Sequence, residues 1–313
     1  MWGIAHSQGI KLPTKDYWEF RELITVPAKG SKSFDGYLQL FHWTELIQSS
    51  PLAVERSVYE VVGGAYRKNN VTTMELRFNP MKRNRGGERD LDHIIMAAAR
   101  GLDQASLEYP QVRAGLILMM DRTFTAEQNA VIVDKAIRYA PRGVVGIDIA
   151  GPRPGGGRYD YRQIEGHVET AREAGLGVTI HVGEEGGQNG VDELAEVIEF
   201  LRPDRIGHGI LAARDPSLME ALRDAGITLE ICPTSNLLTK ALAGEDEIRE
   251  TFRAFVDAGV PFTIATDGPE MMRTHLRDEL ELLERIGALS PDELAEAGAR
   301  GHEVSFVRGV KVA

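Results

Sequence analysis

Histidine and carboxylate side chains recur at the ends of short apolar runs in this chain. Asp148 lies in Gly-Ile-Asp-Ile-Ala-Gly, His181 and Glu184 lie in Thr-Ile-His-Val-Gly-Glu, His208 lies in Arg-Ile-Gly-His-Gly, and Asp267 lies in Thr-Asp-Gly-Pro. Taken singly, each histidine reads as a packed or surface residue, and an Asp before Gly-Pro reads as a turn residue. Buried side by side, the five groups would be costly unless a cation or a polar ligand compensated them. Their recurrence therefore indicates a catalytic or binding site.

The chemistry that suits these side chains is metal-assisted hydrolysis. His181 and Asp267 offer nitrogen and oxygen ligands of the kind that Zn²⁺ accepts, with a position left for water. Bound zinc lowers the pKa of that water towards neutrality, which makes hydroxide available at physiological pH. We expect His208 to orient the hydroxide and take its proton, and Glu184 to act as the general acid.

The elements that must position these residues follow a repeating unit of apolar run, loop and helical stretch. The runs occupy 71–79, 113–121, 144–150, 177–183, 205–209, 227–231 and 261–266. Amphipathic segments lie between them, near 88–109, 125–140, 161–174, 190–201, 215–225 and 246–258. Such alternation requires parallel strands with helical crossovers, and candidate residues at several strand ends favour a barrel over an open sheet. We therefore predict an α/β fold of the parallel (β/α)8 TIM-barrel type.

Seven runs are one fewer than a closed barrel of this type requires. The chain opens on 4–12, which reads as a helix before a turn at Pro13, so we expect the first strand to be missing or replaced by another segment. No composition break divides residues 1–313, and we predict a single metal-dependent hydrolase barrel domain. Its expected parts are a helical insertion at 14–50, barrel strands two to eight over 71–269, and C-terminal helices over 273–313.

Composition limits the class of partner. The 313 residues carry a formal charge of −11, which argues against a nucleic acid or an anionic membrane and leaves a small molecule as the expected partner. No apolar run approaches the roughly 20 residues needed to span a bilayer, and the first residues lack the layout of a secretory signal. A single cysteine excludes an internal disulfide framework and agrees with a cytoplasmic location.

Four motifs taken as a set resemble those of the adenosine and adenine deaminase family of amidohydrolases. They are His-Val-Gly-Glu at 181–184, Arg-Ile-Gly-His-Gly at 205–209, Cys-Pro-Thr-Ser-Asn at 232–236 and Thr-Asp-Gly-Pro at 266–269. The resemblance implies zinc-dependent hydrolytic deamination of a 6-aminopurine nucleoside, with adenosine as the expected substrate. It also implies one zinc ion, held by two histidines of the first strand together with His181 and Asp267.

The same resemblance assigns roles to individual residues. Glu184 corresponds to the acid that protonates purine N1 while hydroxide attacks C6, and His208 corresponds to the catalytic histidine beside the metal. Asp267 is expected to be catalytic as well as metal-binding. Gly151 corresponds to a backbone contact with the purine and ribose side of the substrate. The expected substrate-binding residues are Gly151, Asp148, Gly183 and Gly268.

The zinc ligands depart from the family's pattern. The family's first strand carries His-x-His, and nothing here matches it. His6 lies in a segment that resembles the following helix, and it reads as a solvated residue. The chain then keeps half of the expected ligands, so a metal-poor, inactive fragment is the alternative to an enzyme. Unpaired sheet edges would also allow a homodimer.

Gly268 departs from the pattern as well, because the family usually has an aspartate there that holds purine N7. Either Glu270 or a water replaces that contact, or the substrate differs from adenosine. The alternatives to adenosine are 6-amino-6-deoxyfutalosine and free adenine. Arg153 and Arg158 favour the first alternative, since that extended substrate carries a carboxylate that these arginines could meet.

Overall fold

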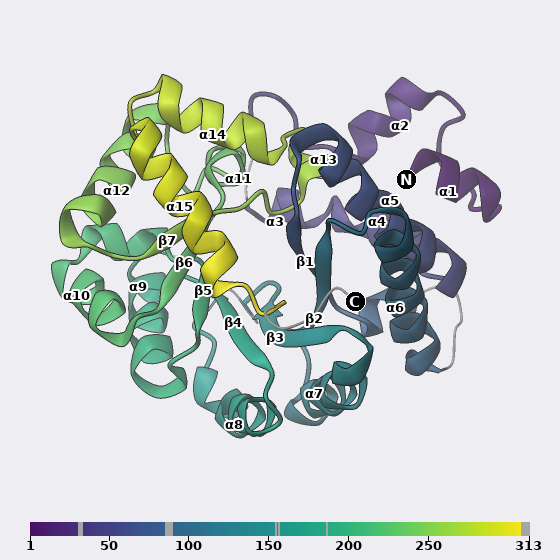
Figure 1. The fold of residues 1–313 in the computed structure, drawn as a ribbon, viewed down its shortest axis with the longest axis horizontal. Coiled ribbons are helices and arrows are strands. Elements are labelled where there is room, and N and C mark those ends of the chain that lie inside the picture. The colour runs from purple at the N-terminus through teal and green to yellow at the C-terminus, as the bar shows by residue number, and fades with distance from the viewer. Residues whose placement is uncertain (31–33, 85–89, 154, 156, 186, 308–313) are drawn as a thin grey trace.

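The computed structural model describes residues 1–30, 34–84, 90–153, 155, 157–185 and 187–307. Seven strands form one sheet in which neighbours are parallel and the spatial order follows the chain order (Figure 1). The strands are β1 (Thr73–Phe78), β2 (Arg113–Asp121), β3 (Val144–Ala150), β4 (Gly177–Val182), β5 (Arg205–His208), β6 (Thr228–Ile231) and β7 (Phe262–Ile264). The sheet curls into an incomplete barrel with helices around its outer side.

The predicted fold class is confirmed. Each expected apolar run contains one strand, with ends no more than two residues from the expected ones. Parallel pairing in chain order arises because each helical crossover returns the chain to the same side of the growing sheet. Among the described residues β1 pairs only with β2 and β7 only with β6, so the barrel has seven strands and is not closed.

Helices connect the strands and cover the outer face of the sheet (Figure 1). Before β1 lie α1 (Trp2–Ser7), α2 (Tyr17–Ile24), α3 (Phe34–Leu38), α4 (Phe41–Ile47) and α5 (Pro51–Asn69). Between the strands lie α6 (Leu91–Glu108), α7 (Ala126–Tyr139), α8 (Glu165–Glu173), α9 (Gly187–Glu196), α10 (Pro216–Ala225), α11 (Pro233–Leu238) and α12 (Glu245–Ala258). After β7 come α13 (Pro269–Met272), α14 (Leu276–Arg285) and α15 (Pro291–Val304). Within the described ranges, none of the helices has the length and apolar character needed to cross a membrane.

Local sequence explains where several helices begin and end. Before α7 the Thr125 hydroxyl accepts a hydrogen bond from the Gln128 N–H, and the Gln128 side chain accepts one from the Thr125 N–H. This reciprocal pair satisfies two N–H groups that the helix itself leaves without acceptors. Gly226 and Gly259 end α10 and α12 with φ of 67° and 69°, a left-handed conformation that only glycine adopts readily.

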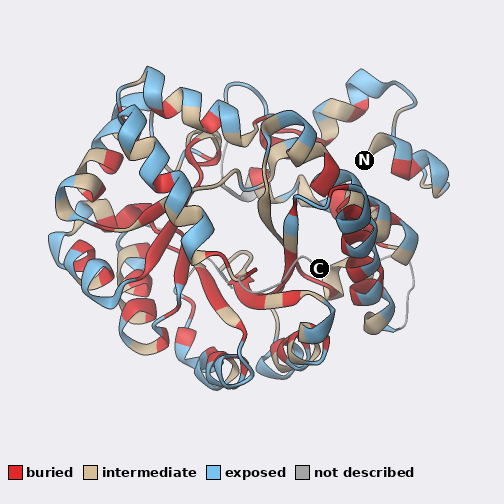
Figure 2. Cartoon of the chain, in the orientation of Figure 1, coloured by how far each residue is buried: buried red, intermediate tan, exposed pale blue. Residues whose placement is uncertain are grey.

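The central strands are buried on both faces (Figure 2). Leu116, Ile117 and Leu118 follow one another in β2, and each has no exposed surface. Consecutive strand residues point to opposite faces of a sheet, so apolar neighbours must cover both the inner and the outer side. The core of the domain therefore continues through the sheet into the interior of the barrel.

The helices before α5 pack in two smaller apolar clusters. Ile4 of α1 and Phe20 of α2 belong to one of them. Tyr37 of α3 belongs to the other, together with Val26, which follows α2, and Met271 of α13. The Val26 N–H also donates a hydrogen bond to the Met271 carbonyl at 2.8 Å. This N-terminal region is thereby fastened to the chain that follows β7.

The C-terminal helix α15 contacts both edge strands. The Thr263 hydroxyl of β7 donates to the Ala297 carbonyl at 3.3 Å, and His302 Nδ1 lies 3.0 Å from the Thr73 hydroxyl of β1. These contacts link the two strands that do not pair with each other. Helix α15 therefore spans the gap between β1 and β7 at the amino-terminal end of the sheet.

The Phe306 side chain covers the strands at that same end. Its ring lies over the Arg205 guanidinium, with 3.6 Å between the guanidinium carbon and the ring centroid. A Cβ atom added at Gly177 would lie 2.3 Å from the ring, and one added at Gly146 would lie 2.8 Å from it. Two strands thus carry glycine where the aromatic ring rests on their backbones.

We expect Phe306→Ala to lower the free energy of unfolding by about 2–4 kcal/mol, because the ring's contacts are lost and a cavity remains. Leu107→Ala is the control, since Leu107 is 86% exposed and its loss should change the free energy by no more than about 0.5 kcal/mol. Denaturant unfolding of both variants measures the difference. Equal stability of the two variants would contradict the packing role of Phe306.

Candidate active site

The residues singled out from the strand ends lie together at the carboxyl-terminal edge of the sheet. His181 is in β4, His208 ends β5 and Asp267 follows β7. The rings of His181 and His208 are 5.5 Å apart between centroids, and His208 Nε2 lies 3.6 Å from a carboxylate oxygen of Glu184. Parallel strands bring such residues together because all their carboxyl ends open at one edge.

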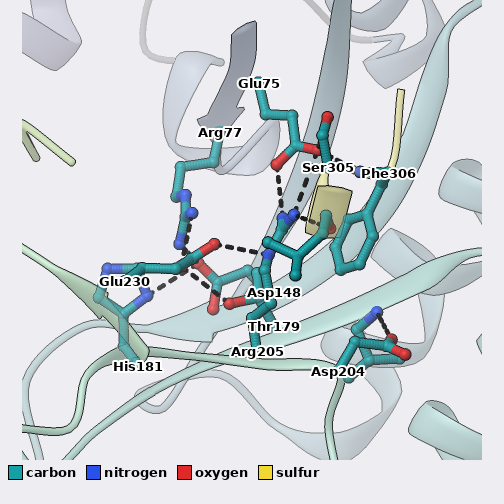
Figure 3. A network of polar contacts seen from close by, with 12 residues as sticks. Glu75, Arg77, Asp148, Thr179, His181, Asp204, Arg205, Glu230, Ser305 and Phe306 are labelled. Atoms are coloured by element: carbon teal, nitrogen blue, oxygen red, sulfur yellow. Dashed lines mark hydrogen bonds and ion pairs between the residues drawn. The ribbon is translucent and has the colours of Figure 1, made fainter. Parts of the chain in front are cut away.

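A buried carboxylate lies beside His181 (Figure 3). Asp148 Oδ2 is 2.8 Å from His181 Nδ1 and 3.1 Å from Arg77 Nη1, and Asp148 Oδ1 accepts the Ile149 N–H at 2.7 Å. Burial by itself would raise the pKa of Asp148, but His181 and Arg77 hold that pKa below its ordinary value. Burial would lower the pKa of His181, and the Asp148 carboxylate raises it instead. Asp148 and His181 thus each shift the pKa of the other, and their contact fixes the direction of the His181 ring.

His208 is held by an amide as well as by its strand. The side-chain nitrogen of Asn236, in α11, lies 3.0 Å from His208 Nδ1. An amide nitrogen only donates, so Nδ1 of a neutral His208 is the acceptor and the ring hydrogen is assigned to Nε2. That nitrogen faces Glu184, which places a donor beside the candidate general acid.

Two hydroxyl groups hold the carboxylate of Asp267. Ser235 donates to Oδ2 at 2.8 Å and Tyr37 donates to the same oxygen at 3.1 Å. Ser235 belongs to the Cys-Pro-Thr-Ser-Asn motif, whereas Tyr37 comes from α3, where sequence analysis placed no site residue. Burial and the neighbouring Asp267 charge raise the pKa of Tyr37, so its hydroxyl stays protonated as a donor.

Glu184 follows β4 and is largely covered, with 14% of its side chain exposed. Its Oε1 lies 3.5 Å from the Thr239 hydroxyl, and its Oε2 faces His208. The carboxyl group thus lies between α11 and the end of β5. Glu184 was expected from its motif, whereas Thr239 lies three residues beyond the Cys-Pro-Thr-Ser-Asn motif and was missed.

The glycines expected to bind substrate differ in whether their positions require glycine. Gly151 has φ of 94°, and a Cβ atom there would lie 2.5 Å from the buried Asp121 carboxylate. Gly183 has φ of 69°, and a Cβ atom there would lie 3.3 Å from the Gly209 backbone. Both positions need glycine for backbone and packing reasons.

Gly268 is different, because a Cβ atom there would meet nothing closer than Met271 Sδ at 3.6 Å. Its φ of −96° is one that any residue adopts. The backbone therefore does not demand glycine at this position. A side chain is absent beside Asp267 although there is room for one.

Arg122 connects two of the candidate positions and was not expected from the sequence. Its guanidinium donates to the carbonyl of Gly151 and to the carbonyl of His181. Tyr161 donates to the same His181 carbonyl at 3.1 Å and also accepts from Arg122 at 3.2 Å. The ends of β3 and β4 are thus tied through their backbones. An arginine directly after a buried strand is the sequence signal that could have drawn attention to it.

Arg153 and Arg158 do not present unpaired charges in this structure. Arg153 forms ion pairs with Glu193 at 2.8 Å and with Glu185. Arg158 is 3.2 Å from Asp192 and 2.7 Å from Glu196. Carboxylates of the chain itself already compensate both guanidinium groups. The expectation that these arginines meet an anionic part of the substrate therefore loses support.

The donors available for a metal ion agree with zinc in type but are few. His181 and Asp267 supply a nitrogen and an oxygen, and a carboxylate beside a metal-binding histidine orients its ring. Within the described part of the chain, however, no group of three or more His, Cys, Asp or Glu side chains is placed to hold an ion. His6 lies exposed in α1, where its ring packs against Trp2. The described residues thus offer fewer donors than the three protein ligands that a catalytic zinc ion usually has.

Comparison with known proteins places the chain in a family. The family model described as adenosine deaminase matches residues 1–311. An adenosine deaminase from Vibrio vulnificus is 30% identical over 278 residues, covering 88% of this chain and 80% of that protein. Among solved structures, adenine deaminase from Arthrobacter aurescens has a TM-score of 0.85 at 21% identity, covering 99% of this chain and 90% of that one. An amidohydrolase from Burkholderia ambifaria with bound zinc has a TM-score of 0.84 at 21% identity, covering 99% and 82% of the two chains. The chain belongs to the adenosine deaminase family of hydrolytic deaminases.

Proposed function

We propose that this protein deaminates a 6-aminopurine nucleoside by hydrolysis, with adenosine and water giving inosine and ammonia. The observation that carries the proposal is the Glu184–His208 contact of 3.6 Å beside His181 at one edge of the sheet. A carboxylic acid and an imidazole at this separation can act on two neighbouring atoms of one substrate. Membership of the family supports the same reaction class.

Glu184 is the residue proposed to activate the purine. In its protonated form it donates to N1, which makes C6 more electrophilic towards water. His208 Nε2–H holds the attacking water by a hydrogen bond. Because Nδ1 of His208 accepts from Asn236, we assign the role of proton acceptor, expected of His208 from the sequence, to Asp267, which takes one proton as the oxygen bonds to C6. Asp267 then returns that proton to the leaving amino group, and Glu184 recovers a proton from the C6 hydroxyl. The products are inosine, protonated at N1, and ammonia, so every proton is accounted for.

Zinc is proposed as the metal, with His181 and Asp267 as the ligands that this chain's described residues supply. When bound, zinc would provide a water molecule whose pKa lies near neutrality. The buried Asp148 beside His181 supports this assignment, because it fixes the direction of the imidazole ring. Since the described residues provide only two donors, the affinity for zinc is the quantity to measure first.

Adenosine is preferred to 6-amino-6-deoxyfutalosine because Arg153 and Arg158 are already paired with carboxylates of the chain. Gly268 favours keeping free adenine and other 6-aminopurines as alternatives, since the absent side chain removes a contact to the purine. The values of kcat/KM for adenosine, adenine and 6-amino-6-deoxyfutalosine decide between them. If adenosine and 6-amino-6-deoxyfutalosine both fail as substrates, the proposed substrate class is wrong.

Glu184→Gln should lower kcat/KM for adenosine by roughly 10²–10⁴-fold, because the amide keeps the shape of the acid but cannot donate its proton to N1. Ammonia release measures the rate, and circular dichroism checks that the variant is folded. Glu250→Gln is the control, since Glu250 is an exposed carboxylate of α12. An active Glu184→Gln variant would exclude the acid role.

Removal of metal should abolish the activity, and added zinc should restore it. We expect purified active protein to contain close to one zinc per chain, and His181→Ala to reduce that content together with the activity. Elemental analysis and chelator titration provide the measurement. A zinc content far below one per chain, with no activity on any purine, would favour the inactive-fragment alternative.

A further inference from the structure

A row of alternating charges runs through the interior of the barrel, from the amino-terminal end of the sheet to the candidate active site (Figure 3). The first five members contact one another through ion pairs between different strands, and the fifth lies within hydrogen-bond distance of the sixth, a histidine. In order, the members are Glu75, Arg205, Glu230, Arg77, Asp148 and His181. The row spans the sheet from β1 to β6, so a group at one end can be fixed by contacts made at the other.

Arg77 is the member that joins the row to the site. Its Nη1 lies 3.1 Å from Asp148 Oδ2, and its Nη2 lies 2.8 Å from Glu230 Oε2. The oxygen that Arg77 contacts on Asp148 is the same oxygen that lies 2.8 Å from His181 Nδ1. A planar guanidinium bridging two carboxylates fixes both of them in direction, which a lysine ammonium cannot do.

Glu230 holds Arg77 in place from the next position of the row. Its Oε2 also accepts the Thr179 hydroxyl at 3.0 Å, and its Oε1 lies 2.8 Å from Arg205 Nε. The side chain of Glu230 is 7% exposed, so these contacts are made in the interior of the barrel. Glu230 therefore has little freedom to move away from Arg77.

The Glu75 end of the row, which is farthest from the candidate site, is held by the C-terminal segment. Arg205 donates to both carboxylate oxygens of Glu75 and, at 2.7 Å, to the Val304 carbonyl. Glu75 in turn accepts the Ser305 hydroxyl at 2.9 Å and the Phe306 N–H at 2.5 Å. Backbone groups thus hold the row at its start, and only the His181 end faces the candidate site.

We propose that Arg77, held by Glu230, is a positioning residue that orients Asp148 and through it the His181 ring. Arg77 is assigned no contact with Glu184 or with the substrate. The kinetic consequence rests on the proposed deaminase function, whereas the effect on the His181 ring does not. Loss of the bridge should lower turnover more than substrate binding, because His181 acts at the reacting end of the site.

The test compares Arg77→Met with the double variant Arg77→Met/Glu230→Gln in the full chain. The single variant leaves Asp148 and Glu230 without their shared cation, and the melting temperature should fall by roughly 5 °C or more. The double variant removes one positive and one negative charge together, so most of that loss should be recovered. Asp92→Asn is the control, because it breaks ion pairs to Lys135 and Arg138 on the outer helices.

If Arg77 positions the site, the double variant keeps kcat about 10–100-fold below wild type with KM little changed, as for other residues that orient a catalytic ligand. Arg77→Lys retains the positive charge but lacks the planar guanidinium that bridges two carboxylates, so its kcat should also stay below that of wild type. This variant provides the test if the other two do not fold. Recovery of kcat together with stability in the double variant would mean that Arg77 is only structural and would overturn the proposal.

A spectroscopic measurement separates this proposal from the proposed function. The ¹⁵N signals of the His181 ring at one fixed pH, assigned with a His181→Ala sample, need no substrate. They should shift in the Arg77 variants and stay unchanged in Asp92→Asn. If the wild-type chain deaminates no purine, the proposed function fails while shifted ring signals still support the positioning role. Unchanged ring signals in the Arg77 variants would overturn it.

Discussion

Carboxylates buried inside the sheet constrain the rest of this structure, because a buried negative charge is tolerated only beside positive charge or hydrogen-bond donors. Burial alone would raise the pKa of Glu230, yet Arg77 and Arg205 lower it to about 2. Glu279 lies buried beside neutral donors, the Thr234 N–H and the Thr274 hydroxyl, and burial raises its pKa. Neighbouring cations rather than depth therefore decide whether the pKa of a buried carboxylate falls or rises, and Glu230, whose pKa falls, lies in the row that leads to the site.

The candidate site combines this compensation with local backbone strain. His208 and Asp267 have φ of 64° and 54°, a left-handed conformation that is uncommon for residues other than glycine. Such conformations persist where the surroundings over-determine them, and they cluster at functional sites. Here Asn236 holds the His208 ring, and the hydroxyls of Ser235 and Tyr37 hold the Asp267 carboxylate. The strain is thus supported by contacts from α11 and α3, outside β5, which His208 ends, and β7, which Asp267 follows.

Much of the fold followed from the sequence because the signals are local. Apolar runs of strand length alternate with amphipathic segments, and a crossover between parallel strands leaves few arrangements for such a chain. The strand-end positions of His181, His208 and Asp267 then predicted their common edge, since parallel strands share a direction. Arg77 was overlooked although it lies within a predicted strand, because the charge of a strand residue does not say which of two faces is the inner one.

The sequence by itself determined the order and direction of the strands, the residues at their carboxyl ends and the family to which those motifs belong. Only the tertiary structure decided which groups hold them: Tyr37 reaches Asp267 across 230 positions of chain, and Glu75 meets Phe306 across 231. Periodicity and capping arise from neighbours a few residues apart, so they can be read along the chain. Contacts between distant elements depend instead on how curved layers pack, and no local pattern encodes that packing.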